Sequence, residues 1–192
     1  MNVTFIRHAE SEANVGSRTN DPYSIKLTEN GHRSAKELVD RIYNPPDLII
    51  VTPHYRTKQT ALPLIQKYSN VPVEEWALHE FTFLSPELCV NTTVTERLPM
   101  VEEYWSLCDP FFRHGSGAET FEEFDSRITE SVHRLRSLSH TDIVVFTHGL
   151  VMKYIKQLKD YGPMPAYASM KHFRDRMLKF PVANVEMWKY QF

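Results

Sequence analysis

Residues 2–8 are Asn-Val-Thr-Phe-Ile-Arg-His, a short apolar run that ends in an arginine and a histidine. Residues 47–51 (Asp-Leu-Ile-Ile-Val) and residues 142–146 (Asp-Ile-Val-Val-Phe) are two further runs of this kind. Compact, β-branched runs bounded by polar or turn-forming residues are typical of strands that are buried on both faces of a sheet. We therefore expect buried strands at residues 2–6, 47–51 and 142–146.

Longer segments with helical periodicity separate these runs. Residues 28–43 place their apolar side chains on one helical face, and Thr28 is suited to cap that helix. Residues 55–68 and 118–138 predict two more helices, and residues 180–190 predict a last strand. Strands that alternate with helices favour an α/β fold, a three-layer α/β/α sandwich with a mostly parallel central sheet.

The length of 192 residues suits a single domain, and no Gly/Ser-rich linker divides the chain. Residues from about 81 to 117 lack clear periodicity, so we interpret them as an insertion over the sheet. The formal net charge is only -2, which gives no overall field to attract nucleic acid or an anionic membrane. An anion site in this chain must therefore be built locally.

The sequence also bears on location. The apolar run at the N-terminus meets Arg7 and His8 too early for a signal peptide. No apolar run approaches the ~20 residues that span a bilayer. Cys89 and Cys108 lack a C-x-x-C spacing and are expected to be free thiols. We expect a cytoplasmic protein.

Cationic and imidazole side chains follow each of the three predicted strands. Ligands of open α/β sheets bind at the carboxyl ends of the strands, so these side chains should meet at one edge. Arginine forks match the oxygens of a phosphate, and a neutral histidine can attack phosphorus. The sequence therefore predicts a phosphate site that contains Arg7, His8, Arg56 and His148.

Five stretches then carry a resemblance: residues 7–14 (Arg-His-Ala-Glu-Ser-Glu-Ala-Asn), 27–35 (Leu-Thr-Glu-Asn-Gly-His-Arg-Ser-Ala), 52–61 (Thr-Pro-His-Tyr-Arg-Thr-Lys-Gln-Thr-Ala), 117–120 (Gly-Ala-Glu-Thr) with Arg127, and 147–149 (Thr-His-Gly). In content and order they are similar to the motifs of the histidine phosphatase superfamily, also called the phosphoglycerate mutase-like family. One departure is Ala9, which stands where the family usually has glycine.

The resemblance assigns roles to residues of this chain. It implies that His8 is the nucleophile that becomes phosphorylated and that Arg7, Arg56 and His148 complete the phosphate pocket, with Ser11 and Asn14 lining it. It places the proton donor after the second strand–helix unit, where Glu80 is the best match, with Glu75 and His79 as rivals. It implies no metal and no other cofactor, and the insertion at about 81–117 would cover the active site.

The expected activity is a phosphatase that acts on a phosphate monoester, either a small molecule or a phosphoprotein, as a monomer or homodimer. A mutase remains an alternative, as does a non-catalytic phosphate-binding protein. A metal hydrolase is disfavoured because the chain has no H-x-x-x-H and no histidine paired with cysteine at short range. Four aromatic residues could form a substrate wall or ordinary core: Tyr104, Trp105, Phe111 and Phe112.

Overall fold

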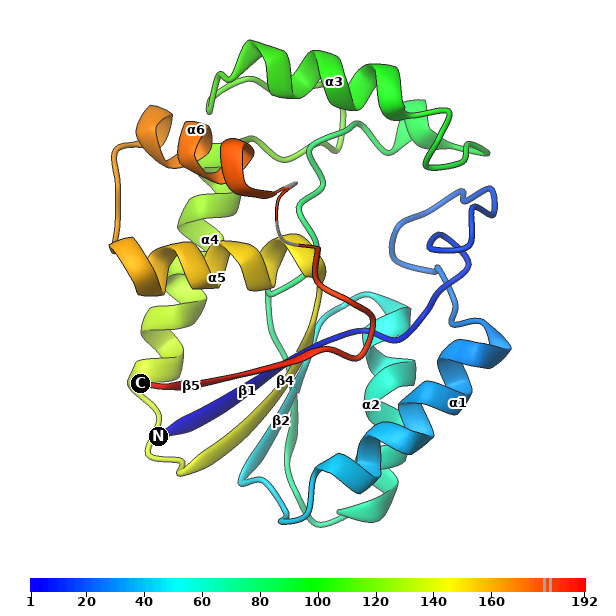
Figure 1. Ribbon diagram of the computed structural model, residues 1–192, viewed down its shortest axis with the longest axis vertical. Coiled ribbons are helices and arrows are strands. Elements are labelled where there is room, and N and C mark those ends of the chain that lie inside the picture. Colours follow the sequence, from blue (N-terminus) through cyan, green and yellow to red (C-terminus); the bar gives the residue numbers. More distant parts are fainter. Residues whose placement is uncertain (178, 180) are drawn as a thin grey trace.

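The strands of the protein form a single sheet in the order β3-β2-β4-β1-β5 in the computed structural model, which describes residues 1–177, 179 and 181–192 (Figure 1). Their bounds are β1 Asn2–Arg7, β2 Leu48–Val51, β3 Val73–Glu75, β4 Asp142–Thr147 and β5 Met187–Gln191. All neighbours pair in parallel except β5, which runs antiparallel to β1. The predicted, mostly parallel sheet is thus confirmed.

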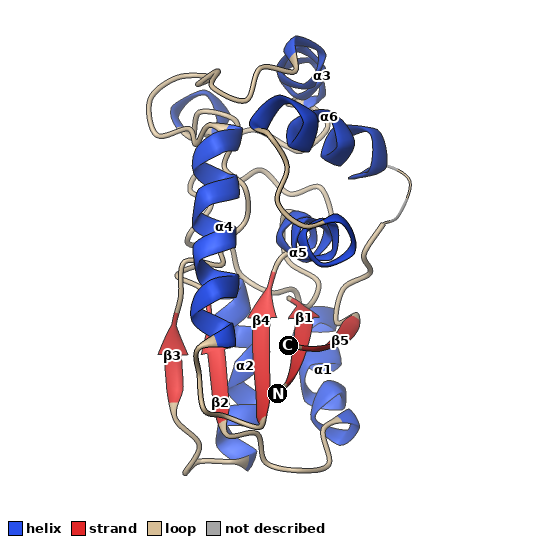
Figure 2. Cartoon of the chain, turned by 90° about the vertical axis from the view of Figure 1, so that its left-hand side faces the viewer, coloured by secondary structure: helices blue, strands red, loops and turns tan. Residues whose placement is uncertain are grey.

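Helices cover both faces of this sheet. Their bounds are α1 Glu29–Leu38, α2 Tyr55–Lys67, α3 Leu98–Leu107, α4 Phe121–Arg136, α5 Gly149–Tyr161 and α6 Ala166–Met177, with short 3-10 turns at Val39–Arg41 and Glu87–Cys89. Helices α1 and α2 cover one face, α4 and α5 the other, and α6 packs on both α4 and α5. In Figure 2 the arrowheads of β1, β3 and β4 point toward the end of the molecule where α3 lies.

Successive side chains of the central strands point to opposite faces of the sheet, where they join two separate hydrophobic cores. Val3 and Phe5 of β1 join the core under α4 and α5, whereas Ile6 joins the core under α1 and α2. The same alternation holds in β4, where Val145 and Phe146 face opposite cores. Successive residues of a strand point to opposite faces, so a strand with helices on both sides must be apolar throughout. This explains the continuous apolar runs of the sequence.

The predicted elements lie close to the observed ones, with small shifts at their ends. β1 and β4 each extend one residue further than predicted, to Arg7 and Thr147. The predicted helix at residues 28–43 ends at Leu38 and continues as the 3-10 turn Val39–Arg41. The last strand starts at Met187; of its predicted start, Phe180 lies outside the described residues.

The segment at residues 81–117 is more ordered than its irregular pattern indicates, because it contains α3. Pro99 stands at the start of that helix, where a missing N–H removes no intrahelical hydrogen bond. Tyr104 and Trp105 of α3 are buried in the core, which agrees with the core alternative for these aromatic residues. Phe111 is 58% exposed and belongs to neither core nor cavity.

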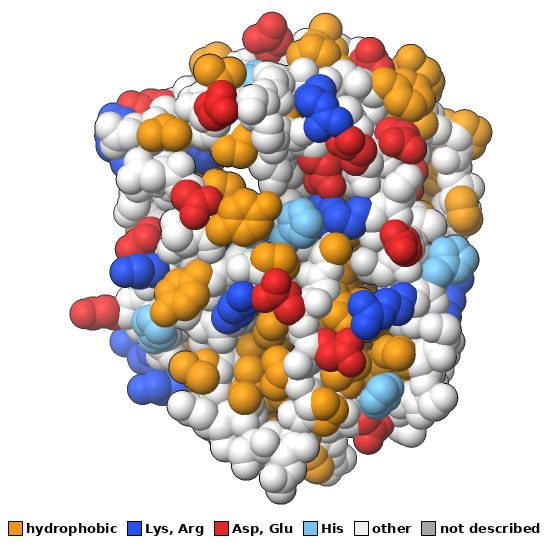
Figure 3. All heavy atoms as spheres, turned by 180° about the vertical axis from the view of Figure 1, so that it is seen from behind, with side chains coloured by type: hydrophobic (Ala, Val, Ile, Leu, Met, Phe, Trp, Pro, Cys, Tyr) orange, Lys and Arg blue, Asp and Glu red, His pale blue; other side chains and the backbone are white. Residues whose placement is uncertain are grey.

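The face of the molecule seen in Figure 3 shows no dominance of one charge. Lysine and arginine side chains lie interspersed with aspartate and glutamate over the face seen in Figure 3. Among the described residues, no helix has the length and apolar character that crossing a membrane requires.

Candidate active site

The order of the sheet brings the predicted site residues together. β4 lies between β1 and β2, and Arg7 pairs with Thr147 across the parallel ladder. The residues that follow these strands are therefore neighbours: the backbone N–H of His8 donates to the carbonyl of Thr147 at 2.9 Å. The rings of His8 and His148 lie 5.3 Å apart between centroids.

His8 is almost fully buried, and its environment fixes its tautomer. Its Nδ1 lies 2.7 Å from the carbonyl oxygen of Ala9. A carbonyl only accepts, so Nδ1 carries the proton and Nε2 keeps its lone pair. Burial, followed by the nearby charge of Arg56, holds the pKa of His8 well below its ordinary value. The imidazole is thus neutral, with one ring nitrogen free to attack.

His148 is oriented by a relay of hydroxyl groups. Arg56 can only donate, so its contact of 3.2 Å makes Nδ1 of His148 an acceptor and leaves the ring proton on Nε2. That N–H donates to the Thr52 hydroxyl at 3.0 Å. The Thr52 hydroxyl lies 2.9 Å from that of Thr57, which in turn donates to a backbone carbonyl. Burial, then Arg56, keeps the pKa of His148 well below its ordinary value.

The two predicted arginines both line the cavity that contains His8. Arg56 is 7% exposed; it also donates to the carbonyl of Pro22, and burial lowers its pKa to about 10. Arg7 donates through Nη1 to the carbonyl of Val182, while its buried Nε has no acceptor among the described residues. Two guanidinium groups beside neutral imidazoles give this cavity a positive charge, the kind of charge that an anion needs for binding.

Glu80 lies in the same cavity, at the N-terminus of α5. Its two carboxyl oxygens accept from the backbone N–H groups of Phe81 at 3.2 Å and Leu150 at 3.3 Å. Burial raises the pKa of Glu80, although Arg56 and these backbone donors act in the opposite direction. A carboxyl group whose pKa is raised can keep a proton and release it to a leaving group.

The rivals of Glu80 do not line this cavity. Glu75 of β3 forms an ion pair of 2.6 Å with Lys58 of α2, and both side chains are partly exposed. His79 has a buried Nδ1 without a partner among the described residues, and burial lowers its pKa to about 4. Of the three candidates, Glu80 alone is a cavity residue within the described part of the chain.

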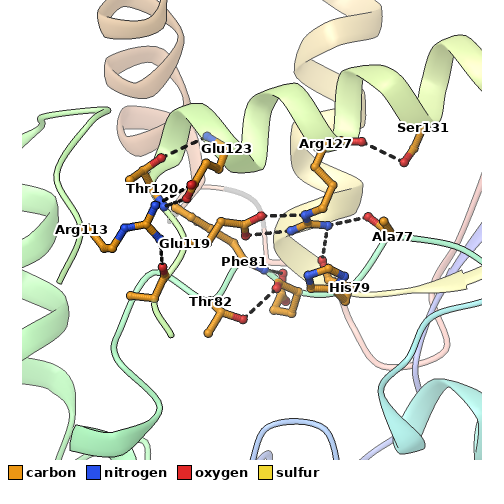
Figure 4. Close-up of polar contacts among 12 residues, drawn as sticks. Ala77, His79, Phe81, Thr82, Arg113, Glu119, Thr120, Glu123, Arg127 and Ser131 are labelled. Carbon is orange, nitrogen blue, oxygen red and sulfur yellow. Dashed lines mark hydrogen bonds and ion pairs between the residues drawn. The ribbon is translucent and has the colours of Figure 1, made fainter. Parts of the chain in front are cut away.

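The backbone before Glu80 is held by one side chain of α4 and one of β4, and Figure 4 shows the contacts of the α4 residue, Arg127. Arg127 of α4 donates to the carbonyls of Ala77 at 2.6 Å and His79 at 3.1 Å, and Thr147 donates to the carbonyl of Leu78 at 2.7 Å. Arg127 is itself fixed by a two-pronged ion pair with Glu119, at 2.7 and 2.8 Å. The motif that combines residues 117–120 with Arg127 thus braces the segment that leads to Glu80.

Ser11 and Asn14 also line the cavity. The amide oxygen of Asn14 accepts from the backbone N–H and hydroxyl of Ser11 at 3.1 and 3.0 Å and from Asn184 at 3.2 Å. Because its oxygen is engaged in this way, Asn14 has its NH₂ group left to donate to a ligand. Ser11 holds Asn14 in place.

The loop after His8 is anchored on the start of α1. The backbone N–H of Thr28 donates to the carbonyl of Glu10 at 3.0 Å, and its hydroxyl donates to the Glu10 carboxylate at 2.6 Å. Gly31 lies against this loop so closely that a Cβ would approach the Glu10 carbonyl oxygen to 2.0 Å. Ala9 is buried and is not among the residues with positive φ, so the methyl group in place of glycine causes no backbone strain.

Three residues near the site were not predicted. Thr52 stands in a quoted motif but was given no role, and Asn184, which donates to the His8 carbonyl at 2.9 Å, follows no motif at all. His54 is buried, with neither ring nitrogen partnered among the described residues, and its ring lies 4.8 Å from that of His148. Burial and then Arg56 lower the pKa of His54 to about 2, so it adds no charge to the site. Within the described residues no cluster of three or more histidine, cysteine or acidic side chains has the arrangement of metal ligands.

Several solved structures share this fold. An α-ribazole phosphatase from Shigella flexneri superposes with a TM-score of 0.76 at 21% identity, covering 100% of this chain and 91% of that one. A phosphoserine phosphatase from Entamoeba histolytica gives 0.71 at 19% identity, covering 100% and 90%. A mycobacterial glucosyl-3-phosphoglycerate phosphatase gives 0.70 at 18% identity, covering 98% and 88%. At these identities the likeness concerns the fold.

Curated protein sequences include none that matches this chain closely enough to count as a relative. At the level of families the result is different. The family model described as "Histidine phosphatase superfamily (branch 1)" matches residues 3–179, which is nearly the whole chain and takes in every motif quoted above. This chain therefore belongs to the histidine phosphatase superfamily, branch 1.

Proposed function

We propose that the protein is a phosphatase that hydrolyses a phosphate monoester through a phosphohistidine on His8. In the first step Nε2 of His8 forms a bond to phosphorus, the ester P–O bond breaks, and Glu80 gives its proton to the leaving oxygen. In the second step water attacks phosphorus, the N–P bond breaks, and the proton of the water passes to the Glu80 carboxylate. Arg7 and Arg56 stabilise the negative charge throughout. His148, whose one N–H donates to Thr52, accepts from Arg56 and holds that guanidinium in position.

One observation supports this proposal above the others. The His8 ring is neutral, its proton is held on Nδ1 by the Ala9 carbonyl, and it lies in the cavity that Arg7 and Arg56 line. A nucleophile needs a free lone pair, and a transferring phosphoryl group needs fixed positive charge around it. A protein that only binds phosphate gains nothing from the first feature, which disfavours the non-catalytic alternative.

The size of the cavity favours a small substrate over a phosphoprotein. Its volume is about 290 Å³, near the lower end of the roughly 300–1,000 Å³ of ligand pockets. Residues 81–117 line one side of it, so we propose that they cover the site within a single domain. The neighbours of the same fold carry the names of phosphatases for α-ribazole phosphate, phosphoserine and glucosyl-3-phosphoglycerate, which agrees with a small ester.

Trapping the intermediate tests the mechanism. Rapid acid-free quenching of the enzyme with a ³²P-labelled ester should give an adduct on His8 that is stable to alkali and labile to acid. His8→Ala should give no adduct and no turnover, whereas His133→Gln, at an exposed position on α4, should retain both. Full turnover by His8→Ala would contradict the mechanism.

The fate of the phosphoryl group separates a phosphatase from a mutase. In ¹⁸O-labelled water a phosphatase releases inorganic phosphate that carries one labelled oxygen, because water attacks the phosphohistidine. A mutase returns the group to an organic acceptor and releases little inorganic phosphate. We expect labelled phosphate in an amount equal to the alcohol formed.

Turnover should not depend on a metal, because the arginines supply the positive charge. We expect kcat/KM to be unchanged after exhaustive chelation, and inorganic phosphate and vanadate to remain competitive inhibitors. Loss of activity in chelator that a divalent ion restores would favour a metal hydrolase instead.

A further inference from the structure

The cavity extends beyond the phosphate site, and its outer wall is apolar. Residues 81–117 and the loop before α1 supply this part, which contains the side chains of Ile25, Phe81, Phe83, Leu84, Val94 and Val101. Phe81 stacks on Phe124 with 4.5 Å between ring centroids, and Phe83 lies 4.9 Å from Tyr104. The aromatic wall is therefore continuous with the core and fixed in position.

The charged side chains in this outer part of the cavity form hydrogen bonds with other groups of the protein. Arg97 is the one cation besides Arg7 and Arg56 among the described lining residues, and it donates to Thr19 Oγ1 at 2.7 Å and to the carbonyl of Thr92 at 2.9 Å. The Asp21 carboxylate accepts from two backbone N–H groups of its own loop, at 3.0 and 3.1 Å. A second anionic group on the substrate would thus meet mostly apolar side chains and one cation, Arg97, which neutral oxygens of Thr19 and Thr92 already hold.

The cavity opens to solvent beside Val94, which is 49% exposed, so its volume indicates how much of the bound group can be buried. An apolar cavity of about 150 Å³ can hold one benzene molecule. The 290 Å³ available here is shared between the phosphoryl group and whatever is attached to it. What remains beside the phenylalanines has room for about one aromatic ring or a chain of five or six carbons.

We propose that the leaving alcohol of the substrate is an uncharged, mostly apolar group of this size. The inference rests on the proposed phosphatase function and narrows its substrate class. It disfavours bisphosphates, phosphoglycerates and polar sugar phosphates, whose second charge or hydroxyl groups would lose water without gaining partners. Apolar surface, in contrast, gains free energy on leaving water.

A matched series of primary alkyl phosphates tests the inference. Their leaving alcohols have similar basicity, so differences in kcat/KM report contacts in the cavity. From ethyl to hexyl phosphate, kcat/KM should rise by up to about fourfold per methylene, the value for full burial of a CH₂ group. Hexyl phosphate should exceed 5-carboxypentyl phosphate at least tenfold.

A positive charge introduced into the apolar wall of the cavity should shift the substrate preference from hexyl phosphate toward 5-carboxypentyl phosphate. Val94 lines the cavity but is 49% exposed, so Val94→Lys can be introduced without burying an ammonium group. It should raise kcat/KM for 5-carboxypentyl phosphate and lower it for hexyl phosphate. Leu107→Lys is the control, because Leu107 is 51% exposed, lies at the far end of α3 and is not a cavity residue.

These experiments distinguish failure of the substrate inference from failure of the proposed phosphatase function. Turnover of all esters with no preference for the apolar ones, and no change in Val94→Lys, would overturn this inference and leave the phosphatase in place. Absence of turnover and of a phosphohistidine with every ester would overturn the proposed function, and the inference with it.

Discussion

At the scale of single residues, burial acts on His8 and Glu80 through the same physical effect with opposite results. A buried site disfavours the charged form of any group. For the imidazole this means a pKa well below the ordinary value, and for the carboxyl a raised pKa. The neutral nucleophile and the protonated acid therefore coexist over a pH range that neither group would provide in water. Turnover should decline as pH falls through the pKa of His8 and as it rises through that of Glu80.

Replacement of Glu80 tests its part in this pair. Glu80→Gln cannot release a proton, so it should slow alkyl phosphates by about 10²–10⁴-fold, the usual contribution of general acid catalysis. p-Nitrophenyl phosphate should slow far less, because nitrophenolate leaves without a proton. The decline of kcat at high pH should also disappear. Equal slowing of both substrates would place the proton donor elsewhere; His79 and Glu75, both near in sequence, would then be tested.

The residues of the site differ in how far the sequence could predict them. Arg7 ends a buried strand, His8 and His148 directly follow one, and Arg56 lies in the first turn of the helix after β2. Their position at one sheet edge is a direct consequence of parallel pairing. Asn184 could not be predicted in this way. Its contact with the His8 carbonyl depends on the path of a loop more than 170 residues later in the chain, and no pattern marks that path.

At the scale of elements, α4 reaches the site through Arg127. We expect Arg127→Met to reproduce the effect of Glu80→Gln in weaker form, with kcat for alkyl phosphates lowered about tenfold to a hundredfold and KM little changed. The reason is that displacement of a catalytic group by about 1 Å can cost 10²-fold in rate. Leaving-group dependence, measured as above, is the readout that a purely structural effect would not alter.

A matched control lies on the same helix. Arg134 of α4 pairs with Glu74 and covers the ring of Trp76, away from the cavity residues. Arg134→Met should leave the ratio of alkyl to nitrophenyl turnover unchanged. If Arg127→Met behaved in the same way as this control, Arg127 would not position Glu80.

The strands could be predicted from the sequence where burial on both faces determined their composition. β1, β2 and β4 have helices on both sides, so their apolar runs mark them in the sequence. β3 has only three residues at the edge of the sheet, two of them exposed, and α3 lies in a segment without clear periodicity, with Pro99 in its first turn. Tertiary packing rather than local sequence determines such elements.

At the scale of the whole molecule, the buried histidines make the fold sensitive to acid. His8, His54, His79 and His148 all have a pKa below 6.5 in the folded protein, about 4 for His79 and about 2 for His54. Below pH 6.5 the unfolded chain therefore binds protons that the folded chain does not, and stability falls as pH falls. Glu80, whose folded pKa is raised, offsets part of this loss.

Urea unfolding as a function of pH measures this effect. Each such histidine contributes a slope of up to about 1.4 kcal/mol per pH unit, so the free energy of unfolding should fall steeply between pH 6.5 and pH 4.5. His54→Leu removes one of these groups and should reduce the slope by about that amount, whereas His133→Gln serves as the surface control. A stability that is flat over this range would mean that the histidines titrate freely in the folded protein.

The position of β1 in the sheet has a consequence for the order in which the protein is made. β1 leaves the ribosome first, yet both of its neighbours, β4 and β5, come from residues 142–147 and 187–191. Synthesis proceeds at about 5–20 residues per second, so β1 and His8 wait on the order of 10–40 s for the strands that hold them. Nascent chains that end before β4 therefore carry His8 without the complete phosphate pocket. The nucleophile is the first part of the site to be synthesised and among the last to be put in place.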